Sequence, residues 1–548
     1  MKRNGMKLIA ILLALVMVLA LAACGGGGAA PAPTQAPSGG GTTPSGGGTT
    51  PSGGGTPSGG GATAEKKVLN VAIASDEGTL SPCVMTTAAL GIAYVVLEPL
   101  WDVTIDGTVI MELCESVDVV SDTEQTIHLR QGVKFSNGNP LTASDVLFSM
   151  KLHKAAGAIG GARVQTVDLE KTNVIDDNTL DLHLLAPTIA NWTILSQCRI
   201  YDEESYTEEG AALHPIGTGA FIVTDYVPGS SITLEKNENY WGAEPAFDVM
   251  NVKVLAEDSQ RVNALETNLV DLAAITTTDY DYVNGLDGIG ILGNYTGNYC
   301  GMNFNFSPSA AFYQNEDARR AICHAINGEA ILNTVYLGHG KMMHACVPDY
   351  CFDFEDRFND LDDTYSIGYN VDLARQLAES SGLSQKTVRI VTNGTTTAIR
   401  MAEMAQAMLK DANIPAEIFN YDPATATQMQ YSLDGAWDIM IGGGIAPNRR
   451  VGDLLINGVR YRPDLTAEGA FEDNAAYLEE VPLCMSLQDE KALSDELYKM
   501  MGIYEKQVLG YSLFDMENYM GYDEALDPAS IRLSVGSSYP RYHEIKFA

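Results

Sequence analysis

One segment of low complexity limits where this chain can form a core. From Gly25 to Thr63 it consists almost entirely of glycine, serine, threonine, proline and alanine, with repeats such as TPSGGG. These residues cannot bury enough apolar surface to offset the entropy of ordering them, so we predict a disordered linker over 24–65. As a flexible coil it would reach roughly 35 Å. The folded part is therefore expected to begin near residue 66.

The segment before the linker has the pattern of a secretory signal. A head containing lysine and arginine, Met1–Lys7, precedes an apolar run, Leu8–Leu21, that is too short for a typical spanning helix of ~20 residues. The tetrad LAAC, which ends at Cys24, resembles the lipobox of bacterial lipoproteins, whose cysteine is diacylated and becomes the mature N-terminus. The resemblance implies a signal peptide over 1–23, lipidation of Cys24 and a position on the extracellular face of the cell membrane. An ordinary signal peptide cut nearby and an uncleaved anchor are the alternatives.

Length and charge narrow the class of protein. A chain of 548 residues is too long for a single core, so we expect two or three lobes. It has 34 basic and 70 acidic residues, for a net charge of −36. Such a surface argues against binding nucleic acid or docking on anionic lipid, and favours cationic or amine-bearing ligands. For most of the acidic residues a solubilising extracellular surface is the simpler explanation.

The cysteines do not form a dense disulfide framework. Of nine, Cys24 is set aside as the lipid site and eight are scattered through the remaining chain. Cys346 and Cys351 form the one close pair, with His344 beside them. A structural metal, a local disulfide and two buried thiols all remain open for this pair.

Hydrophobic periodicity predicts alternating strands and helices, most clearly in the second half. Asp145 begins a helix, with Thr142 three residues earlier as in a capping box. The predicted strands are 68–74, 179–185, 220–226, 231–236, 388–391, 416–419 and 438–441, and the predicted helices are 90–100, 259–269, 317–337, 372–383, 398–412, 489–501 and 503–508. Buried strands that alternate with helices indicate a βαβ lobe.

No catalytic signature is present in the sequence. It contains no GxxxxGK[ST], GxSxG or HExxH motif, and no GxGxxG after a strand. The eight histidines do not lie at ligand spacing from carboxylates along the chain. The absence of these motifs does not by itself exclude an enzyme, but no catalytic residue can be assigned, and our expectation is a protein that is not an enzyme and has no cofactor or metal ligand.

A series of segments carries a resemblance to one family. TIHLRQGVKFSNGNPLTASDVLFSMK, residues 126–151, resembles the hallmark segment of the family 5 extracellular solute-binding proteins. These are the oligopeptide-, dipeptide- and nickel-binding components of ABC importers. Further segments match in the family's order: LEPL at 97–100, PIGTG at 215–219, NENYW at 237–241, Arg261 to Asp271, DARRAI at 317–322, and Tyr369 to Gly382. The resemblance runs from about residue 68 to at least residue 437.

The resemblance implies an α/β fold of the type II periplasmic-binding-protein class. Two lobes joined by a hinge close over a ligand. Lobe I would take residues 66–305, including an inserted subdomain at about 88–211. Lobe II would take 306–509, and 510–548 would return to lobe I.

The resemblance also implies where the ligand binds. Asp76 and Glu77 fall at positions that contact peptide in the family's oligopeptide binders. After Trp437, which we expect to line the cleft unless it packs in the core, come Gly442, Gly443 and Gly444. In peptide binders this region offers backbone hydrogen bonds and an aspartate that pairs with the α-amine of the ligand.

That aspartate position is Gly443 here, which departs from the family's pattern. An amine in a dry cleft needs a partner carboxylate. Asp76, Glu77 or Asp453 would have to supply it, or the alignment is shifted by a few residues.

The function implied is that of a lipid-anchored solute-binding receptor of an ABC importer. It would capture peptides or a peptide-like amine as a monomer and deliver them to the permease and its ATPase subunits. It would contact the membrane through the lipid on Cys24 and bind no nucleic acid. A nickel or metal-chelate binder of the same family, a surface sensor and a secreted hydrolase are the alternatives.

Overall fold

The computed structural model describes the chain from residue 66 onward, with gaps. The described residues are 66–76, 78–85, 89–104, 107–188, 190–295, 298–365, 367–430, 436–445, 450–456, 469–487, 489–533 and 539–548. The expected signal peptide, Cys24 and linker lie outside them, as does Glu77. Among the helices of the described residues, none has both the length and the apolar character needed to cross a membrane.

Lobe I is built on a mixed sheet of seven strands in the described residues. Its order is β12 (Ile289–Asn294), β19 (Asn518–Asp523), β11 (Leu272–Ile275), β1 (Val68–Ile73), β10 (Val249–Val254), β9 (Ser231–Lys236) and β8 (Phe221–Val227). Strand β1 lies parallel to both of its neighbours, β10 and β11, and α7 (Asp258–Glu266) connects these two. The other pairs in this sheet are antiparallel. The strand predicted over 68–74 is therefore central to the lobe.

A subdomain is inserted between β1 and β8. Its four described strands are antiparallel, in the order β4 (Cys114–Ser121), β5 (Glu124–Leu129), β7 (Thr179–His183) and β6 (Asn173–Asp176). The hairpin β2 (Trp101–Val103)–β3 (Val109–Met111) and the helices α3 (Ala143–Ala155), α4 (Ala158–Ala162) and α5 (Asn191–Leu195) accompany them. At the start of α3 the backbone N–H of Thr142 donates to the Asp145 carboxylate at 2.8 Å, which confirms the predicted capping box.

Lobe II has its own sheet, with six strands in the part of the chain that is described. The order is β14 (Gly340–Met342), β18 (Gly510–Met516), β13 (Asn298–Phe304), β17 (Ile439–Ile445), β15 (Val388–Thr392) and β16 (Ala416–Asn420). Strand β15 is parallel to β16 and β17, and α13 (Thr396–Asp411) connects β15 to β16, as the βαβ prediction required.

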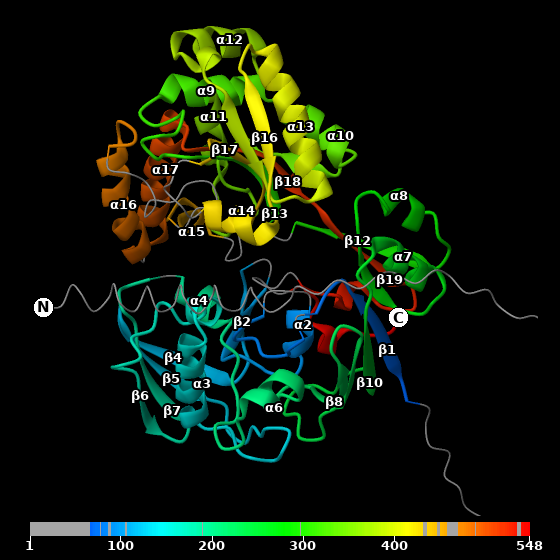
Figure 1. Cartoon of the computed structure of the whole chain (residues 1–548). Helices are drawn as coiled ribbons and strands as arrows, with labels where there is room; N and C mark the ends of the chain where they lie inside the picture. The colour runs from blue at the N-terminus through cyan, green and yellow to red at the C-terminus, as the bar shows by residue number, and fades with distance from the viewer. Residues whose placement is uncertain are drawn as a thin grey trace, which may run out of the picture. The chain divides into compact units, whose positions relative to one another are not determined.

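Helices surround the second sheet (Figure 1). They are α9 (Glu316–Ala325), α10 (Gly328–Val335), α11 (Asp360–Tyr365), α12 (Val371–Ser380), α14 (Pro423–Gln430), α15 (Val451–Ile456), α16 (Asn474–Ser486) and α17 (Glu490–Gln507). Their apolar faces and the sheet form the largest core of the molecule, which includes Phe312, Tyr477 and Phe514. The lobe is thus an α/β unit with a core of its own.

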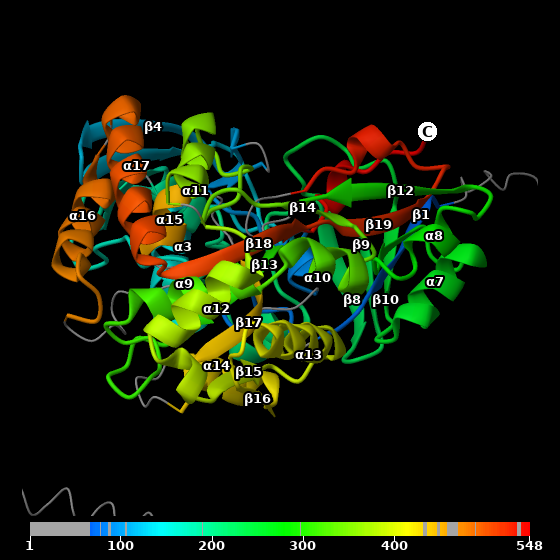
Figure 2. The same ribbon diagram turned by 90° about the horizontal axis from the view of Figure 1, so that it is seen from above.

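The chain passes between the two sheets at two points within the described residues. One is the step from β12 to β13 and the other the step from β18 to β19, which Figure 2 shows as one continuing run. Asn294 pairs with Asn518 on the lobe I side, and Tyr299 pairs with Asp515 on the lobe II side, so the two crossings lie side by side. The second sheet begins at Asn298 and ends at Met516, and the boundaries expected at 306 and 509 fall just inside these limits. This two-lobed α/β architecture with an extra subdomain is the fold that the family resemblance implied.

Candidate functional site

A cavity of about 530 Å³ lies where the subdomain meets lobe II. This volume falls in the range of sites for small molecules, ~300–1,000 Å³. The subdomain contributes Val119, Ser121, Asp122, Gln125, Thr188 and Trp192, and lobe II contributes Phe352, Asp353, Glu355, Arg450, Leu493 and Ser494. Because its two walls come from different lobes, any hinge motion would change its volume.

Local structure explains how the subdomain side is presented. Ser121 ends β4 and Gln125 follows at the start of β5, so the turn of this hairpin forms the rim of the cavity. The side chain of Val119 on this rim is 67% exposed. Trp192 lies in α5, where its ring packs on Trp101 with the centroids 4.7 Å apart. The subdomain core therefore holds the Trp192 side chain in place on this side of the cavity.

Arg450 brings a positive charge to the opposite wall. It directly precedes α15, and its guanidinium lies 6.0 Å from the centroid of the Phe352 ring. Its Nε is buried and has no hydrogen-bond partner among the described residues. A buried guanidinium nitrogen without a partner is costly, so this atom has an unmet demand for an acceptor.

Asp353, the residue after Phe352, has a carboxylate oxygen without a hydrogen-bond partner among the described residues. This oxygen is an acceptor, whereas Arg450 Nε is a donor. Asp353 Oδ1 accepts a hydrogen bond of 2.7 Å from the Val451 N–H, while Oδ2 has no partner in the described part of the chain. Burial raises the pKa of the Asp353 carboxyl, and the Val451 N–H and the Arg450 charge oppose that rise. Gln125 Oε1, across the cavity, is likewise buried without a partner. Three residues that line the cavity thus each carry a polar atom that is buried without a hydrogen-bond partner among the described residues.

Glu355 is less available for a ligand than Asp353. Arg357 pairs with it at 2.8 Å and with Asp495 of α17 at 3.0 Å, and Ser494 donates to the Glu355 carboxylate. These contacts fix α17 against the segment that carries Phe352 and Asp353. Glu355 and Ser494 therefore stabilise the wall of the cavity.

The structure places Asp76 away from this cavity. Its Oδ1 accepts from the Tyr226 hydroxyl at 2.6 Å and from the Gly78 N–H at 2.7 Å, and its Oδ2 accepts from the Gly229 N–H at 2.7 Å. Tyr226 and Gly229 belong to the β8–β9 hairpin, so Asp76 ties the loop after β1 to that hairpin. Both of its oxygens already have partners within lobe I.

Trp437 packs in the core, which is the alternative considered for it. Its side chain is 4% exposed and its indole N–H donates to the Met429 carbonyl at 2.9 Å. The neighbouring Asp438 is also structural, because it pairs with Arg389 at 2.8 Å and accepts from the Ala311 N–H at 3.0 Å. The interior of lobe II accounts for both residues.

The three glycines lie in β17, the strand next to the crossing strand β13. Gly442 pairs with Gly301, Gly443 with Cys300 and Gly444 with Tyr299. A Cβ built on Gly442 would meet no atom within 4 Å, so β17 borders open space at this position. The side chain of Asp453, the remaining acid that the sequence offered, lies outside the described residues.

The cysteine pair does not join His344 in a metal site within the described residues. Cys346 and Cys351 are buried thiols, whereas His344 is exposed. Sequence reasoning also missed Asp353 and Arg450. Asp353 follows the cysteine pair by two residues, and Arg450 lies two residues beyond the segment 442–448 that the family resemblance singled out.

Fold and cavity together define a class, a two-lobed α/β binding protein. The family model described as bacterial extracellular solute-binding proteins, family 5 Middle, matches residues 108–456, and the chain belongs to this family. Its members are binding proteins and not enzymes.

Individual relatives are distant. The chain is 25% identical over 356 residues to the dipeptide-binding protein of Escherichia coli (strain K12), a match covering 57% of this chain and 64% of that protein. It is 23% identical over 353 residues to the nickel-binding protein NikA of Staphylococcus aureus (strain NCTC 8325 / PS 47), covering 62% of this chain and 67% of that one. The match to the first relative thus spans less than two thirds of its length.

A solved structure has the same fold. The oligopeptide-binding protein AppA from Bacillus subtilis, in complex with a nonapeptide, superposes with a TM-score of 0.70 at 18% identity. The match covers 88% of this chain and 100% of AppA. At this identity the likeness concerns the fold.

Proposed function

We propose that this protein is a lipid-anchored solute-binding receptor of an ABC importer and that it binds peptides or a peptide-like amine solute. Family membership supports a binding role, and the relatives include a protein named for dipeptide binding and a structure in complex with a nonapeptide. The observation that carries the proposal is the interlobe cavity with unpartnered polar atoms on Arg450 and Asp353. A permease and its ATPase subunits would receive the solute.

The cavity suits a solute that carries both charges. Arg450 would bind a carboxylate, because a guanidinium forms charge-assisted hydrogen bonds to carboxylate oxygens. Of the three acids that line the same cavity, Glu355 is already paired with Arg357, and Asp353 and Asp122 would accept from an amine. Trp192 and Phe352 would pack on apolar parts of the solute. In this arrangement the absence of an aspartate at Gly443 does not leave the amine without a partner.

Binding would be coupled to closure about the crossing strands. Solute that bridges the subdomain and lobe II stabilises the form in which the two walls are close. The permease would recognise that form. No bond of the solute is made or broken in this cycle.

The anchor and the cargo are separate parts of the proposal. Lipid on Cys24 would hold the protein at the extracellular face of the membrane, and the Gly/Ser/Thr-rich linker would let the binding lobes stand clear of it. Cys24→Ser should move the protein from the membrane fraction to the medium with its fold intact. A parent protein that takes up no labelled fatty acid, or a Cys24→Ser variant that stays membrane-bound, would overturn the anchoring.

Thermal stabilisation and calorimetry test the cargo. The purified protein would be screened against dipeptides, oligopeptides, simple amines and Ni²⁺–histidine chelates. A ligand at 100 times its Kd should stabilise the protein by ~2.7 kcal/mol. Stabilisation by peptides or amines would support the proposal. Stabilisation by the chelate alone would show that the protein is a metal-chelate binder instead, and no stabilisation by any of these ligands would overturn the proposal.

Two variants connect the binding to this cavity. Arg450→Gln and Asp353→Asn should each weaken the best ligand by ~10-fold or more, as expected for a charge-assisted hydrogen bond worth ~1.5–3 kcal/mol. Arg375→Gln on the exposed face of α12 is the matched control and should leave the affinity unchanged. Equal affinity in all three variants would place the solute elsewhere.

A further inference from the structure

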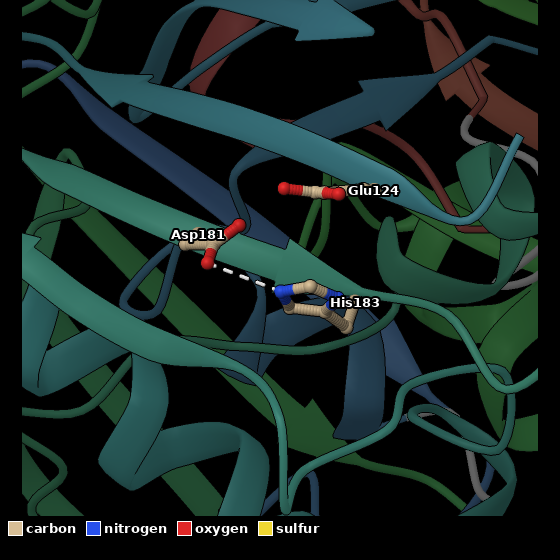
Figure 3. Close-up of side chains that lie close together, drawn as sticks. All are labelled: Glu124, Asp181 and His183. Carbon is tan, nitrogen blue, oxygen red and sulfur yellow. Dashed lines mark hydrogen bonds and ion pairs between the residues drawn. The ribbon is translucent and has the colours of Figure 1, made fainter. Parts of the chain in front are cut away.

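The sequence shows no histidine at ligand spacing from carboxylates along the chain, but the fold brings one such group together. Along the chain Glu124 is far from Asp181 and His183, but the fold brings the three side chains together on the outer face of the subdomain sheet. Figure 3 shows their polar ends facing one another above β5 and β7. Within the described residues this is the one group of three or more His, Cys, Asp and Glu side chains at metal-ligand separation.

Strand register holds the three residues in place. Glu124 of β5 pairs directly with His183 of β7, and Asp181 lies two residues earlier on the same strand. Residues two apart in a strand share a face, so Asp181 and His183 point the same way. Leu180 and Leu182, which alternate with them along β7, are buried in the subdomain core. A one-residue slip would therefore move these leucines out of the core, which fixes the register and with it the cluster.

The separations fit a metal ion. His183 Nε2 lies 3.1 Å from Asp181 Oδ2, and ligand atoms of all three residues lie within 4.8 Å of one another. Two ligands at ~2.1 Å from a metal are ~3.0–3.4 Å apart along an octahedral or tetrahedral edge. The His183–Asp181 distance already matches such an edge. A rotation of the longer Glu124 side chain would bring its carboxylate to the third position.

The charges of the cluster also lack compensation. The Glu124 carboxylate has no hydrogen-bond or ion-pair partner in the part of the chain that is described. Asp181 accepts from Asn173 Nδ2 at 2.8 Å and pairs with His183, and no lysine or arginine pairs with it there. Two half-buried carboxylates beside an imidazole are balanced in charge by one divalent cation.

We propose that Glu124, Asp181 and His183 form a site for a divalent transition-metal ion of the Zn²⁺ or Ni²⁺ class. Mixed imidazole and carboxylate ligands select such ions over Mg²⁺ and Ca²⁺, which take oxygen ligands. The ion replaces the hydrogen bond between His183 and Asp181, and water completes its coordination. It links β5 to β7 and so stabilises the subdomain sheet.

This site is distinct from the interlobe cavity. Gln125, the next residue after Glu124, is buried and lines that cavity, so the two sites occupy opposite faces of β5. The inference does not depend on the proposed solute. A solute variant and a metal variant therefore report on different sites.

The same sheet face supplies a matched control. His128 Nε2 lies 3.0 Å from Asp118 Oδ2, a second histidine–carboxylate pair on β5 and β4. It lacks a third ligand within reach in the described residues. His128 therefore belongs to a histidine–carboxylate pair on the same sheet face, more exposed than that of His183, without the complete set of ligands.

The test is calorimetric titration of the purified protein with ZnCl₂ and NiCl₂, without added chelator or solute. We expect one site whose affinity falls at least ~10-fold in His183→Ala, Asp181→Asn and Glu124→Gln. His128→Ala and Arg450→Gln should bind as the parent protein does. Binding of Co²⁺ should give a d–d absorption band that His183→Ala loses. Circular dichroism of each variant checks that it is folded.

Two results would overturn the proposal. The first is a parent protein that binds neither ion more tightly than His183→Ala does. The second is a loss of affinity in His128→Ala or Arg450→Gln as large as that in the cluster variants.

Discussion

Arg541 and Glu112 are 429 residues apart in the chain, yet Nη2 of the arginine donates to Oε1 of the glutamate at 2.6 Å. Arg541 also pairs with Asp102 and, at 2.8 Å, with Glu544. Both Arg541 and Asp102 are almost fully buried. The last residues of the chain are thereby fixed to the hairpin β2–β3 at the base of the subdomain.

Removing this arginine should destabilise lobe I strongly. Arg541→Ala leaves two buried carboxylates without their cation, and breaking a buried pair from one side costs ~3–5 kcal/mol. Equilibrium denaturation in urea measures the loss. Arg532→Ala is the control: its partner is also Glu544, but Arg532 is 54% exposed, so the expected change is ~0–1 kcal/mol. Similar losses in both variants would contradict the role given to the buried cluster.

Glu98 should make the folded protein less stable as the pH rises, which is opposite to the usual effect of a carboxyl group. Its Oε2 accepts from the Thr218 hydroxyl at 2.7 Å and from the Trp241 N–H at 2.8 Å, and burial, with the nearby Glu112 charge, raises the pKa of its carboxyl from 4.5 to about 8. The folded state then holds a proton that the unfolded state has released. Its contribution to stability is fully present below pH 4.5 and is lost as the pH rises to about 8.

Glu98→Gln tests this pH dependence, because glutamine keeps the acceptor oxygen and cannot ionise. Melting temperatures measured between pH 5 and 8 should fall more steeply for the parent protein than for the variant. The variant should be the more stable of the two at pH 8. Parallel curves over this range would show that Glu98 is ionised in the folded protein.

Asp76→Ala should act on stability before it acts on binding. The change removes the carboxylate that accepts from the Tyr226 hydroxyl and from the N–H groups of Gly78 and Gly229, at a cost of ~1–3 kcal/mol. Ser75→Ala, on the exposed neighbouring residue, should be neutral. Thermal melting distinguishes the two variants. A fully stable Asp76→Ala variant with much weaker solute binding would favour the ligand-contact role that the family resemblance implies.

Regular parts of the fold followed from the sequence, and each error has a specific structural cause. The strand predicted over 68–74 is β1, and the alternation after residue 370 is the βαβ unit. The helix predicted over 90–100 ends at Ala93, because the carbonyls of Val95 and Val96 accept from the N–H groups of Phe221 and Gly219. These bonds are made to a segment far along the chain, so hydrophobic periodicity carries no trace of them.

The helix predicted over 317–337 is two helices for a different reason. α9 ends at Ala325, and the side chain of Asn327 accepts from the Ala330 N–H at 2.9 Å to begin α10. Apolar spacing continues across the break, and Asn327 was its one visible signal.

The functional sites were harder to predict because they combine distant residues. Asp353 and Arg450 meet only when the segments before α11 and α15 pack together. Glu124 and His183 meet only through the register of β5 and β7. Spacing along the sequence can indicate binding residues that share one helix or loop. The residues of both sites described here come from different elements and meet only in the folded protein.

Gly442 offers a test of whether solute approaches β17. A side chain at this position would enter open space, so Gly442→Val should fold with a melting temperature close to that of the parent protein. If solute lies against the strand, the added isopropyl group should weaken its affinity by ~10-fold or more by occupying that space. Gly217 provides the contrast: a Cβ there would lie 2.0 Å from the Val96 carbonyl oxygen, so Gly217→Ala should destabilise the protein severely. Calorimetry on the folded Gly442→Val variant measures its affinity for the solute. An unchanged affinity would mean that the solute does not lie against β17 and binds only in the cavity around Arg450.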